Sequence, residues 1–271
     1  MGPRSMFLMT AAALLFASPG AFAQQGAVGG EWKSFGGNLG STKYSTLDQI
    51  NAENVDMLRI AWRRPLVDAE YLRMDPNLRF SNVSRAAPLI VNGVGYVPNA
   101  VGLVEAFDIG TGETSWIQQP FEGPDGLRGT GTRGVAFWTD GTDSRILAQR
   151  GEYLYALNPE TGSTFPDFGD GGRVDLKVGL GEGARYRWGG APTVVRDVVV
   201  LGQSMSDTFE TKEANRGDVR AFDVRTGALR WQFHTVPQAG EFGTDTWDDA
   251  AWEYSGHAPV WSLFSADAEL G

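Results

Sequence analysis

Several short motifs in the chain contain residue types that could do chemistry, but their contexts exclude most of the reactions that they suggest. Residues 129–134 have the glycine spacing of a dinucleotide-binding loop, yet they lead into the strand-like residues 135–138 and open no helix, which such a loop requires. The two histidines, His234 and His257, are far apart and form no His-x-x-x-His pair, so zinc catalysis is poorly supported. Residues 202–206 lack the final glycine of a nucleophile elbow, which disfavours hydrolysis.

A carboxylate-rich segment, residues 203–217, offers a different chemistry. It separates two strand-like segments of a kind that short turns join elsewhere in the chain. Carboxylate oxygens are the hard ligands that calcium prefers, but a solvated acidic loop explains the same composition, so both interpretations stay open. Residues 167–172 also contain aspartates and glycines, but they lack the alternating ligands and the closing glutamate of a calcium loop and are predicted to form a turn.

The elements that must position these residues are indicated by an internal repeat. Residues 106–116 and 221–231 share the pattern Ala-Phe-Asp-x-x-Thr-Gly-x-x-x-Trp, and residues 156–162 carry a weaker copy with Phe165 near the expected aromatic position. In each copy the alanine belongs to an alternating strand, the Asp or Asn caps a turn and the glycine supplies a positive φ. The tryptophan then begins an outer strand, where its ring can pack against the neighbouring unit.

A second repeated element precedes the first. Residues 87–97 and 191–200 both start with Ala-Pro and are predicted to be β-hairpins, and residues 258–260 are typical of the start of another. The spacing of the repeats matches one four-stranded propeller blade plus a loop of variable length, whereas a β-sandwich would not repeat in this way. We therefore predict an all-β fold, a β-propeller of four-stranded blades with about three blades and the start of a fourth. Because the sequence stops at Gly271, where the last hairpin would turn, we expect it to be truncated at the C-terminus.

Composition and the N-terminus restrict the cellular setting. Residues 1–23 contain a basic residue, a short apolar run and Ala-Phe-Ala, the order of a secretory signal peptide, so we expect a periplasmic propeller domain over residues 24–271 without a transmembrane span. The chain has no cysteine, so neither disulfides nor thiolate metal sites contribute. A formal charge of −10, spread along the chain, argues against nucleic acid as a partner and favours a small molecule or a protein, or it merely keeps the protein soluble.

These residues resemble a known family, the pyrroloquinoline-quinone (PQQ) dependent, or quinoprotein, alcohol and glucose dehydrogenases. The Ala-x-Asp-x-x-Thr-Gly-x-x-x-Trp unit is similar to the tryptophan-docking repeat of this family, and residues 32–38, 44–51 and 54–62 resemble its N-terminal part. The resemblance covers nearly all of residues 24–271. It implies the N-terminal part of an eight-bladed propeller.

The resemblance also implies positions for cofactor-binding residues. Residues 132–136 resemble the segment whose arginine contacts the quinone, which makes Arg133 a candidate partner for a PQQ carboxylate, and Trp261 lies where the family places the tryptophan on which the quinone stacks. Arg85 lies where some relatives have an acidic cofactor contact, and Gly189 lies where a hydroxyl side chain is common. The alternatives are a surface arginine for Arg133 and a blade-packing ring for Trp261.

For the metal, the resemblance implies a carboxylate ligand from the loop of residues 203–216, either Glu213 or Asp207. The metal would be calcium or a lanthanide. The adjacent cysteine pair of methanol-oxidising relatives is absent, which points to the sugar or general alcohol branches. The catalytic aspartate base is expected downstream of Gly271, so no catalytic residue is assigned in this chain, and the fragment alone is expected to be inactive.

The expected activity of the intact protein is oxidation of an alcohol or an aldose sugar by hydride transfer to PQQ. Electrons would leave to a cytochrome c or a membrane quinone. The alternative is a non-catalytic propeller that serves as a protein-interaction scaffold in the cell envelope, because such scaffolds use the same docking repeat.

Overall fold

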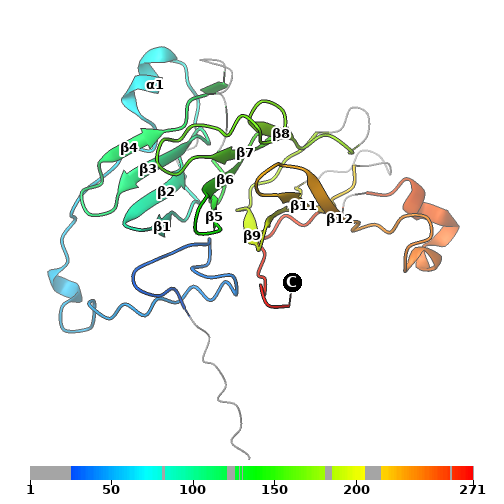
Figure 1. Ribbon diagram of the computed structural model, residues 1–271, viewed down its shortest axis with the longest axis horizontal. Coiled ribbons are helices and arrows are strands. Elements are labelled where there is room, and N and C mark those ends of the chain that lie inside the picture. Colours follow the sequence, from blue (N-terminus) through cyan, green and yellow to red (C-terminus); the bar gives the residue numbers. More distant parts are fainter. Residues whose placement is uncertain are drawn as a thin grey trace, which may run out of the picture.

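Three antiparallel sheets of four strands each make up the body of the protein in a computed structural model that describes residues 26–80, 83–120, 126–127, 129, 131–180, 185–204, 215–256 and 258–270 (Figure 1). Each sheet is a meander in chain order. The prediction of an all-β propeller with three blades is thereby confirmed. The strands of the three blades are β1(Leu89–Val91), β2(Val94–Pro98), β3(Val104–Asp108) and β4(Thr114–Ile117); β5(Ala136–Thr139), β6(Ser144–Arg150), β7(Tyr153–Leu157) and β8(Arg173–Asp175); and β9(Thr193–Val195), β10(Val198–Leu201), β11(Val219–Asp223) and β12(Leu229–Phe233).

Helical structure among the described residues is short and lies outside the blades. The one α-helix, α1(Ala69–Met74), begins at Asp68, whose side chain accepts a hydrogen bond from the backbone of Glu70. The remaining helices are 3-10 turns, η1(Val55–Met57), η3(Thr244–Thr246) and η4(Asp248–Glu253). No described helix is long and apolar enough to cross a membrane. The expected signal peptide, residues 1–23, lies outside the described residues.

The repeated turn has the predicted geometry. In the first blade the carboxylate of Asp108 accepts hydrogen bonds from the backbone N–H groups of Gly110 and Thr111, and Gly112 has φ of +75°. The same arrangement recurs at Asn158 and Asp223, because a positive φ at the following glycine closes the turn without a steric penalty.

Tryptophan docking joins the blades. The indole N–H of Trp116 donates to the carbonyl of Pro159 at 2.9 Å, and its ring lies against Gly162 of the second blade. Trp62, which precedes the first blade, docks in the same way on Gly112 and donates to the carbonyl of Ile109 at 3.0 Å. Each ring thus seals one seam between neighbouring units.

The seam between the second and third blades departs from this pattern. Val174, not an aromatic ring, lies against the turn glycine Gly227. The sequence placed Phe165 in the docking role, but the outer strand β8 begins later, at Arg173, and Phe165 instead packs beneath the guanidinium of Arg145, 4.0 Å from its ring centre. The expectation for Phe165 was therefore wrong.

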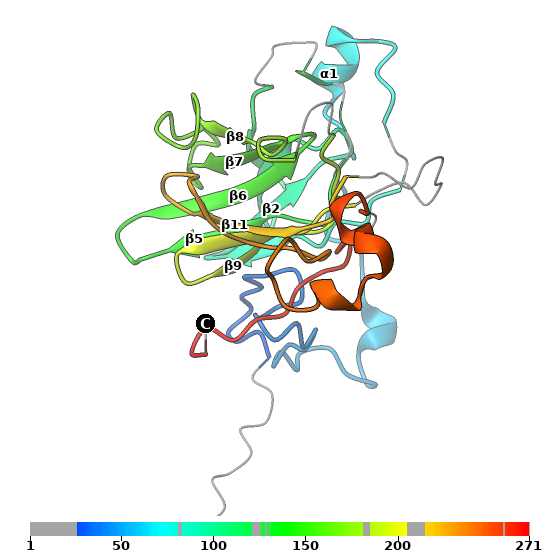
Figure 2. The ribbon, with the colours of Figure 1, turned by 90° about the vertical axis from the view of Figure 1, so that its right-hand side faces the viewer.

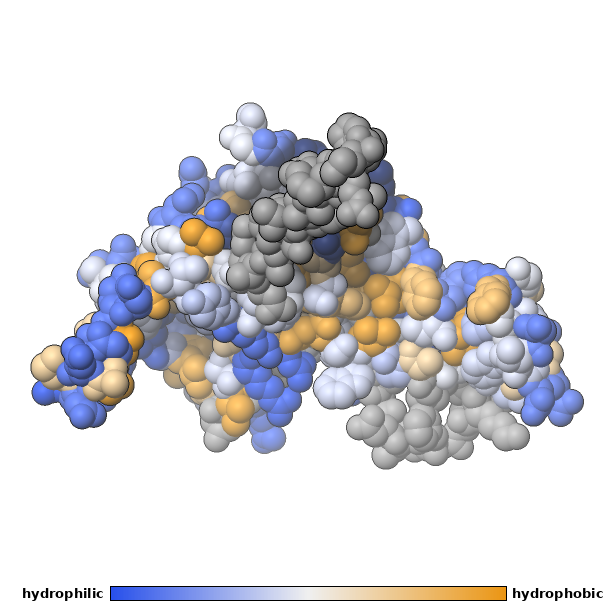
Figure 3. Space-filling model, turned by 90° about the horizontal axis from the view of Figure 1, so that it is seen from below, coloured by the Kyte–Doolittle hydropathy of each residue, from blue (hydrophilic) through white to orange (hydrophobic). Residues whose placement is uncertain are grey.

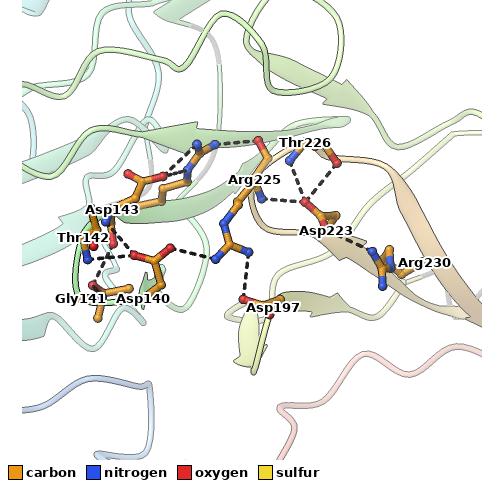
Figure 4. A network of polar contacts seen from close by, with 11 residues as sticks. Asp140, Gly141, Thr142, Asp143, Asp197, Asp223, Arg225, Thr226 and Arg230 are labelled. Atoms are coloured by element: carbon orange, nitrogen blue, oxygen red, sulfur yellow. Dashed lines mark hydrogen bonds and ion pairs between the residues drawn. The ribbon is translucent and has the colours of Figure 1, made fainter.

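Polar contacts strengthen that seam (Figure 4). Arg225, in the β11–β12 turn, donates to Asp140 at 2.9 Å and to Asp197 at 3.0 Å, and its guanidinium lies 4.3 Å from the ring centre of Trp138. Its backbone carbonyl accepts from Arg145 at 2.7 Å. The backbone N–H of Asp143 and the guanidinium of Arg225 hold the pKa of Asp140 well below its usual range. The carboxylates of two blades are thus tied to one cation.

Two apolar cores fill the seams. One contains Leu89, Tyr96 and Ile146, between the first and second blades, and the other contains Leu147, Phe168 and Phe222, between the second and third. Most of the side chains in both cores are fully buried. Successive strand residues alternate between the two faces of a blade, so the consecutive residues Ile146 and Leu147 of β6 belong to different cores.

The first and last described segments of the chain lie next to the first strands of the blades. Trp32 pairs with Ile90 of β1, and the backbone N–H of Ala266 donates to the carbonyl of Leu39, so the N-terminal and C-terminal segments lie side by side next to β1, β5 and β9 (Figure 2). Residues 258–260, expected to open another blade, form no strand among the described residues.

Several large apolar side chains remain exposed, and apolar surface gathers in the middle of the face seen from below (Figure 3). Trp231, at the docking position of the third blade, is 44% exposed. Its neighbours Leu229 and Phe233 are also exposed. This face of the third blade has no docking partner among the described residues.

Candidate functional site

A cavity of about 370 Å³ brings together three of the predicted cofactor-binding residues, Arg85, Arg133 and Gly189. Each lies three or four residues before the first strand of a different blade, β1, β5 or β9. The segments entering the three blades therefore meet at one end of the sheets, which explains why residues far apart in sequence line the same space.

Arg133 is held by both of its neighbouring segments. Its guanidinium Nη1 donates to the carbonyl of Gly189 at 2.8 Å, and its backbone N–H lies 3.2 Å from the carbonyl of Gly190. The backbone carbonyl of Arg133 accepts from the N–H of Ala87 at 2.9 Å. One edge of the half-buried guanidinium is thus fixed, and its remaining donors are available to a ligand in the cavity.

The charge of the cavity lining is positive. The one acidic residue among the described lining residues, Glu105, is buried and already paired with Arg64 at 2.8 Å and with the side-chain amide of Asn99 at 3.0 Å. Arg85 is exposed at the edge of the cavity, and neither it nor Arg133 forms an ion pair with a carboxylate among the described residues. In a chain of net charge −10, two guanidiniums in one cavity without a carboxylate partner among the described residues favour an anionic ligand.

A buried tyrosine lies behind this lining. Tyr71 of α1 packs in a small apolar cluster with Val101 and Leu127. Burial, followed by the nearby carboxylate of Glu105, raises its pKa to about 12. Tyr71 therefore stays neutral at physiological pH and supports the wall without contributing charge.

Gly189 has room for a small side chain. A Cβ atom added there would lie 3.5 Å from Nη1 of Arg133, which is an ordinary van der Waals distance. The hydroxyl side chain that the family resemblance implied at this position would therefore fit, and in this chain the backbone carbonyl of Gly189 makes the contact to Arg133.

Trp261 lies at the same end of the sheets but does not line this cavity. It follows Val260, whose carbonyl accepts from the N–H of Gln203 at 3.2 Å, just beyond the end of β10. Its side chain is 61% exposed, so a face of the indole is open. The structure brings Arg85, Arg133 and Gly189 together and leaves Trp261 apart from them.

The predicted metal ligands, Asp207 and Glu213, lie outside the described residues. Within the part of the chain that the structure describes, no group of three or more His, Cys, Asp or Glu side chains could hold a metal ion.

The buried ion pair of Arg64 and Glu105 in the cavity lining was not predicted from the sequence. Asn99, whose side-chain amide donates to Glu105, was not predicted either. A signal was present for Asn99, since it follows β2 directly and so lies at the end of the blade where β1 begins. Nothing in the local sequence indicates the pair, because Arg64 precedes the blade and meets Glu105 only in the folded chain.

Comparison with known proteins shows the family to which this propeller belongs. Residues 32–271 match the PQQ family described as the β-propeller domain of glucose, ethanol and alcohol dehydrogenases. The chain belongs to this family, and the resemblance inferred from the sequence is confirmed.

Individual members of this family are similar to the chain over most of its length. The chain is 33% identical over 251 residues to the dehydrogenase subunit of the quinone alcohol dehydrogenase of Gluconobacter oxydans, which covers 86% of this chain and 30% of that protein. It is 28% identical over 263 residues to the quinohemoprotein alcohol dehydrogenase of Comamonas testosteroni, covering 89% and 32%. The crystal structure of the latter superimposes with a TM-score of 0.65 at 26% identity, over 89% of this chain and 34% of that one. The chain thus spans about a third of the length of these relatives.

Proposed function

We propose that this chain forms part of the PQQ cradle of a periplasmic dehydrogenase that oxidises an alcohol or an aldose sugar. The observation that carries the proposal is the cavity in which Arg85, Arg133 and Gly189 converge. PQQ is a planar polyanion, and two guanidiniums without carboxylate partners among the described residues match its carboxylates in charge and in donor geometry.

The residues of this chain would bind and orient the cofactor. Arg133, fixed by Gly189, would meet one carboxylate bidentately, Arg85 would meet another at the edge of the cavity, and Trp261 would offer its open face for stacking. When bound, the quinone supplies a two-electron acceptor for the hydride of an alcohol. Asp207 or Glu213 would contribute a carboxylate to a calcium or lanthanide ion. The electron acceptor would be a cytochrome c or a membrane quinone.

The charge of the cavity favours this proposal over a non-catalytic scaffold. A scaffold needs the docking repeat for its blades, but it has no use for two arginines that line one cavity without a carboxylate partner among the described residues. The names of the relatives support the same choice, since they include quinone alcohol dehydrogenases and a quinoprotein glucose dehydrogenase.

Titration with PQQ and calcium tests the proposal, with quenching of tryptophan fluorescence as the binding signal. Dye-linked oxidation of alcohols and aldoses by the full-length protein tests turnover. We expect saturable binding and turnover of at least one class of substrate. Absence of both from the full-length protein would remove the proposal in favour of the scaffold.

A further inference from the structure

Two glycines flank the long segment between β10 and β11, and both contact residues 258–260. A Cβ atom on Gly202 would overlap the carbonyl oxygen of Val260 and would lie 3.0 Å from the indole nitrogen of Trp188. A Cβ atom on Gly217 would overlap Pro259, lying 2.5 Å from its nitrogen, and would lie 2.6 Å from the carbonyl oxygen of Ala258. The backbone of the 258–260 segment thus rests directly on these two glycines.

The glycines are required by this close approach alone. Neither Gly202 nor Gly217 has a positive φ, so a left-handed backbone is not the reason for glycine at these positions. This distinguishes them from the turn glycines Gly112, Gly162 and Gly227, whose left-handed conformation itself favours glycine. At Gly202 and Gly217 a side chain is excluded because another stretch of backbone occupies its place.

Gly202 also accepts a hydrogen bond from a buried tyrosine. The hydroxyl of Tyr186 donates to the carbonyl of Gly202 at 2.6 Å, and burial raises the pKa of this tyrosine, so the hydroxyl keeps its proton. On the other side, the N–H of Gln203 donates to the carbonyl of Val260 at 3.2 Å. Gly202 therefore lies between a fixed hydroxyl and the backbone of the 258–260 segment.

We propose that Gly202 and Gly217 form a glycine seat for residues 258–260 that positions Trp261 for contact with a planar ligand. Trp261 follows the seated segment directly, and it is 61% exposed, so few contacts of its own side chain fix its orientation. Its direction is set by the backbone behind it. The two glycines are positioning residues, and their role rests on the proposed function of Trp261 as the stacking face for the quinone.

The test compares Gly202→Ala and Gly217→Ala with Gly40→Ala. Gly40 is a matched control, because it has no positive φ and an added Cβ would have its nearest neighbours at 3.7 Å. In the full-length protein we expect PQQ affinity to fall by about tenfold to a hundredfold in each seat variant, since the loss of stacking on one aromatic ring weakens binding by about that much, and to stay within about twofold in the control. Faster hydrogen exchange at the amide of Gln203 would report the displaced segment without any cofactor.

Combination with Trp261→Ala separates positioning from a general loss of structure. If the seat acts through Trp261, the double variant Gly202→Ala with Trp261→Ala binds PQQ no more weakly than Trp261→Ala alone. Additive losses, or unchanged affinity in both seat variants, would overturn the seat. Should Gly202→Ala fail to fold, the same double-variant experiment with Trp261→Ala can be made with Gly217→Ala. It can also be made with Tyr186→Phe, which adds no volume and removes only the hydrogen bond to the carbonyl of Gly202.

The outcomes also separate the seat from the proposed function. If wild-type protein and Gly40→Ala bind PQQ while the seat variants bind equally well, only the seat is overturned. If wild-type protein does not bind PQQ at all, the proposed function is overturned, and the role of the seat for a quinone is overturned with it.

Discussion

Replacement of Gly162 by alanine should weaken the protein more than the same replacement at an equally left-handed but open turn. Gly162 has φ of +73°, and a Cβ atom there would lie 2.5 Å from Cε3 of the docked Trp116. Gly171 has φ of +60°, and nothing lies within 4 Å of the corresponding position. Both variants place an alanine in a left-handed conformation, which lowers the stability of the fold, but only Gly162→Ala also displaces the ring of Trp116.

The magnitudes follow from these two terms. A left-handed conformation costs an alanine about 1–2 kcal/mol, which is the expected destabilisation for Gly171→Ala. Overpacking adds about 1–3 kcal/mol, so Gly162→Ala should lose about 2–5 kcal/mol. Displacement of the ring also breaks the hydrogen bond from Trp116 to Pro159.

Urea unfolding of both variants, followed by circular dichroism, gives the two free energies of unfolding. Gly112→Ala provides a second comparison, because Trp62 covers that glycine as Trp116 covers Gly162. Equal losses for Gly162→Ala and Gly171→Ala would refute the idea that the docked ring, and not the turn alone, makes glycine necessary.

Three further outcomes are expected. Arg133→Lys should lower PQQ affinity about tenfold or more, because an ammonium cannot reproduce the bidentate fork, and unchanged affinity in a fluorescence titration would contradict this. Arg85→Gln should lower PQQ affinity more at low ionic strength than at high, which titrations at two salt concentrations would check; equal losses would argue against a charge contact. Asp140→Asn should destabilise the chain at neutral pH. Since the pKa of Asp140 is depressed in the folded state, its contribution is present above the unfolded value of about 3.9 and is lost as pH falls through the lower folded value. The difference from wild type in urea midpoint should therefore shrink below about pH 4, whereas a difference independent of pH would assign the effect to packing.

The parts of the fold that were predictable from the sequence are those specified within one hairpin. The turn at Asn92 and Gly93, with φ of +51° and +79°, and the capped turn at Asp108 each depend on neighbouring residues, so their signals are local. The exchange of Phe165 for Val174 was not predictable, because the start of β8 is decided by packing against the third blade.

The candidate site divides in the same way. Arg133 and Gly189 were singled out through the family resemblance, and their mutual contact became visible only in the folded chain, because they lie far apart in the sequence. The seat at Gly202 had no signal, because its φ is ordinary and its constraint comes from Val260, far along the chain. Close backbone approach between distant segments leaves only a glycine in the sequence, and this chain has 36 of them.

The ion pairs of Arg225 make the contact between the second and third blades sensitive to salt. Where Trp116 joins the first two blades, the contact consists of ring packing and one neutral hydrogen bond, which salt affects little. Where Val174 replaces the ring, the second and third blades are joined partly by charges that lie near the surface. Concentrated salt, with a screening length of about 3 Å at 1 M, should therefore weaken these ion pairs and slightly lower the stability of the protein, while the apolar core that contains Leu147, Phe168 and Phe222 keeps the second and third blades together.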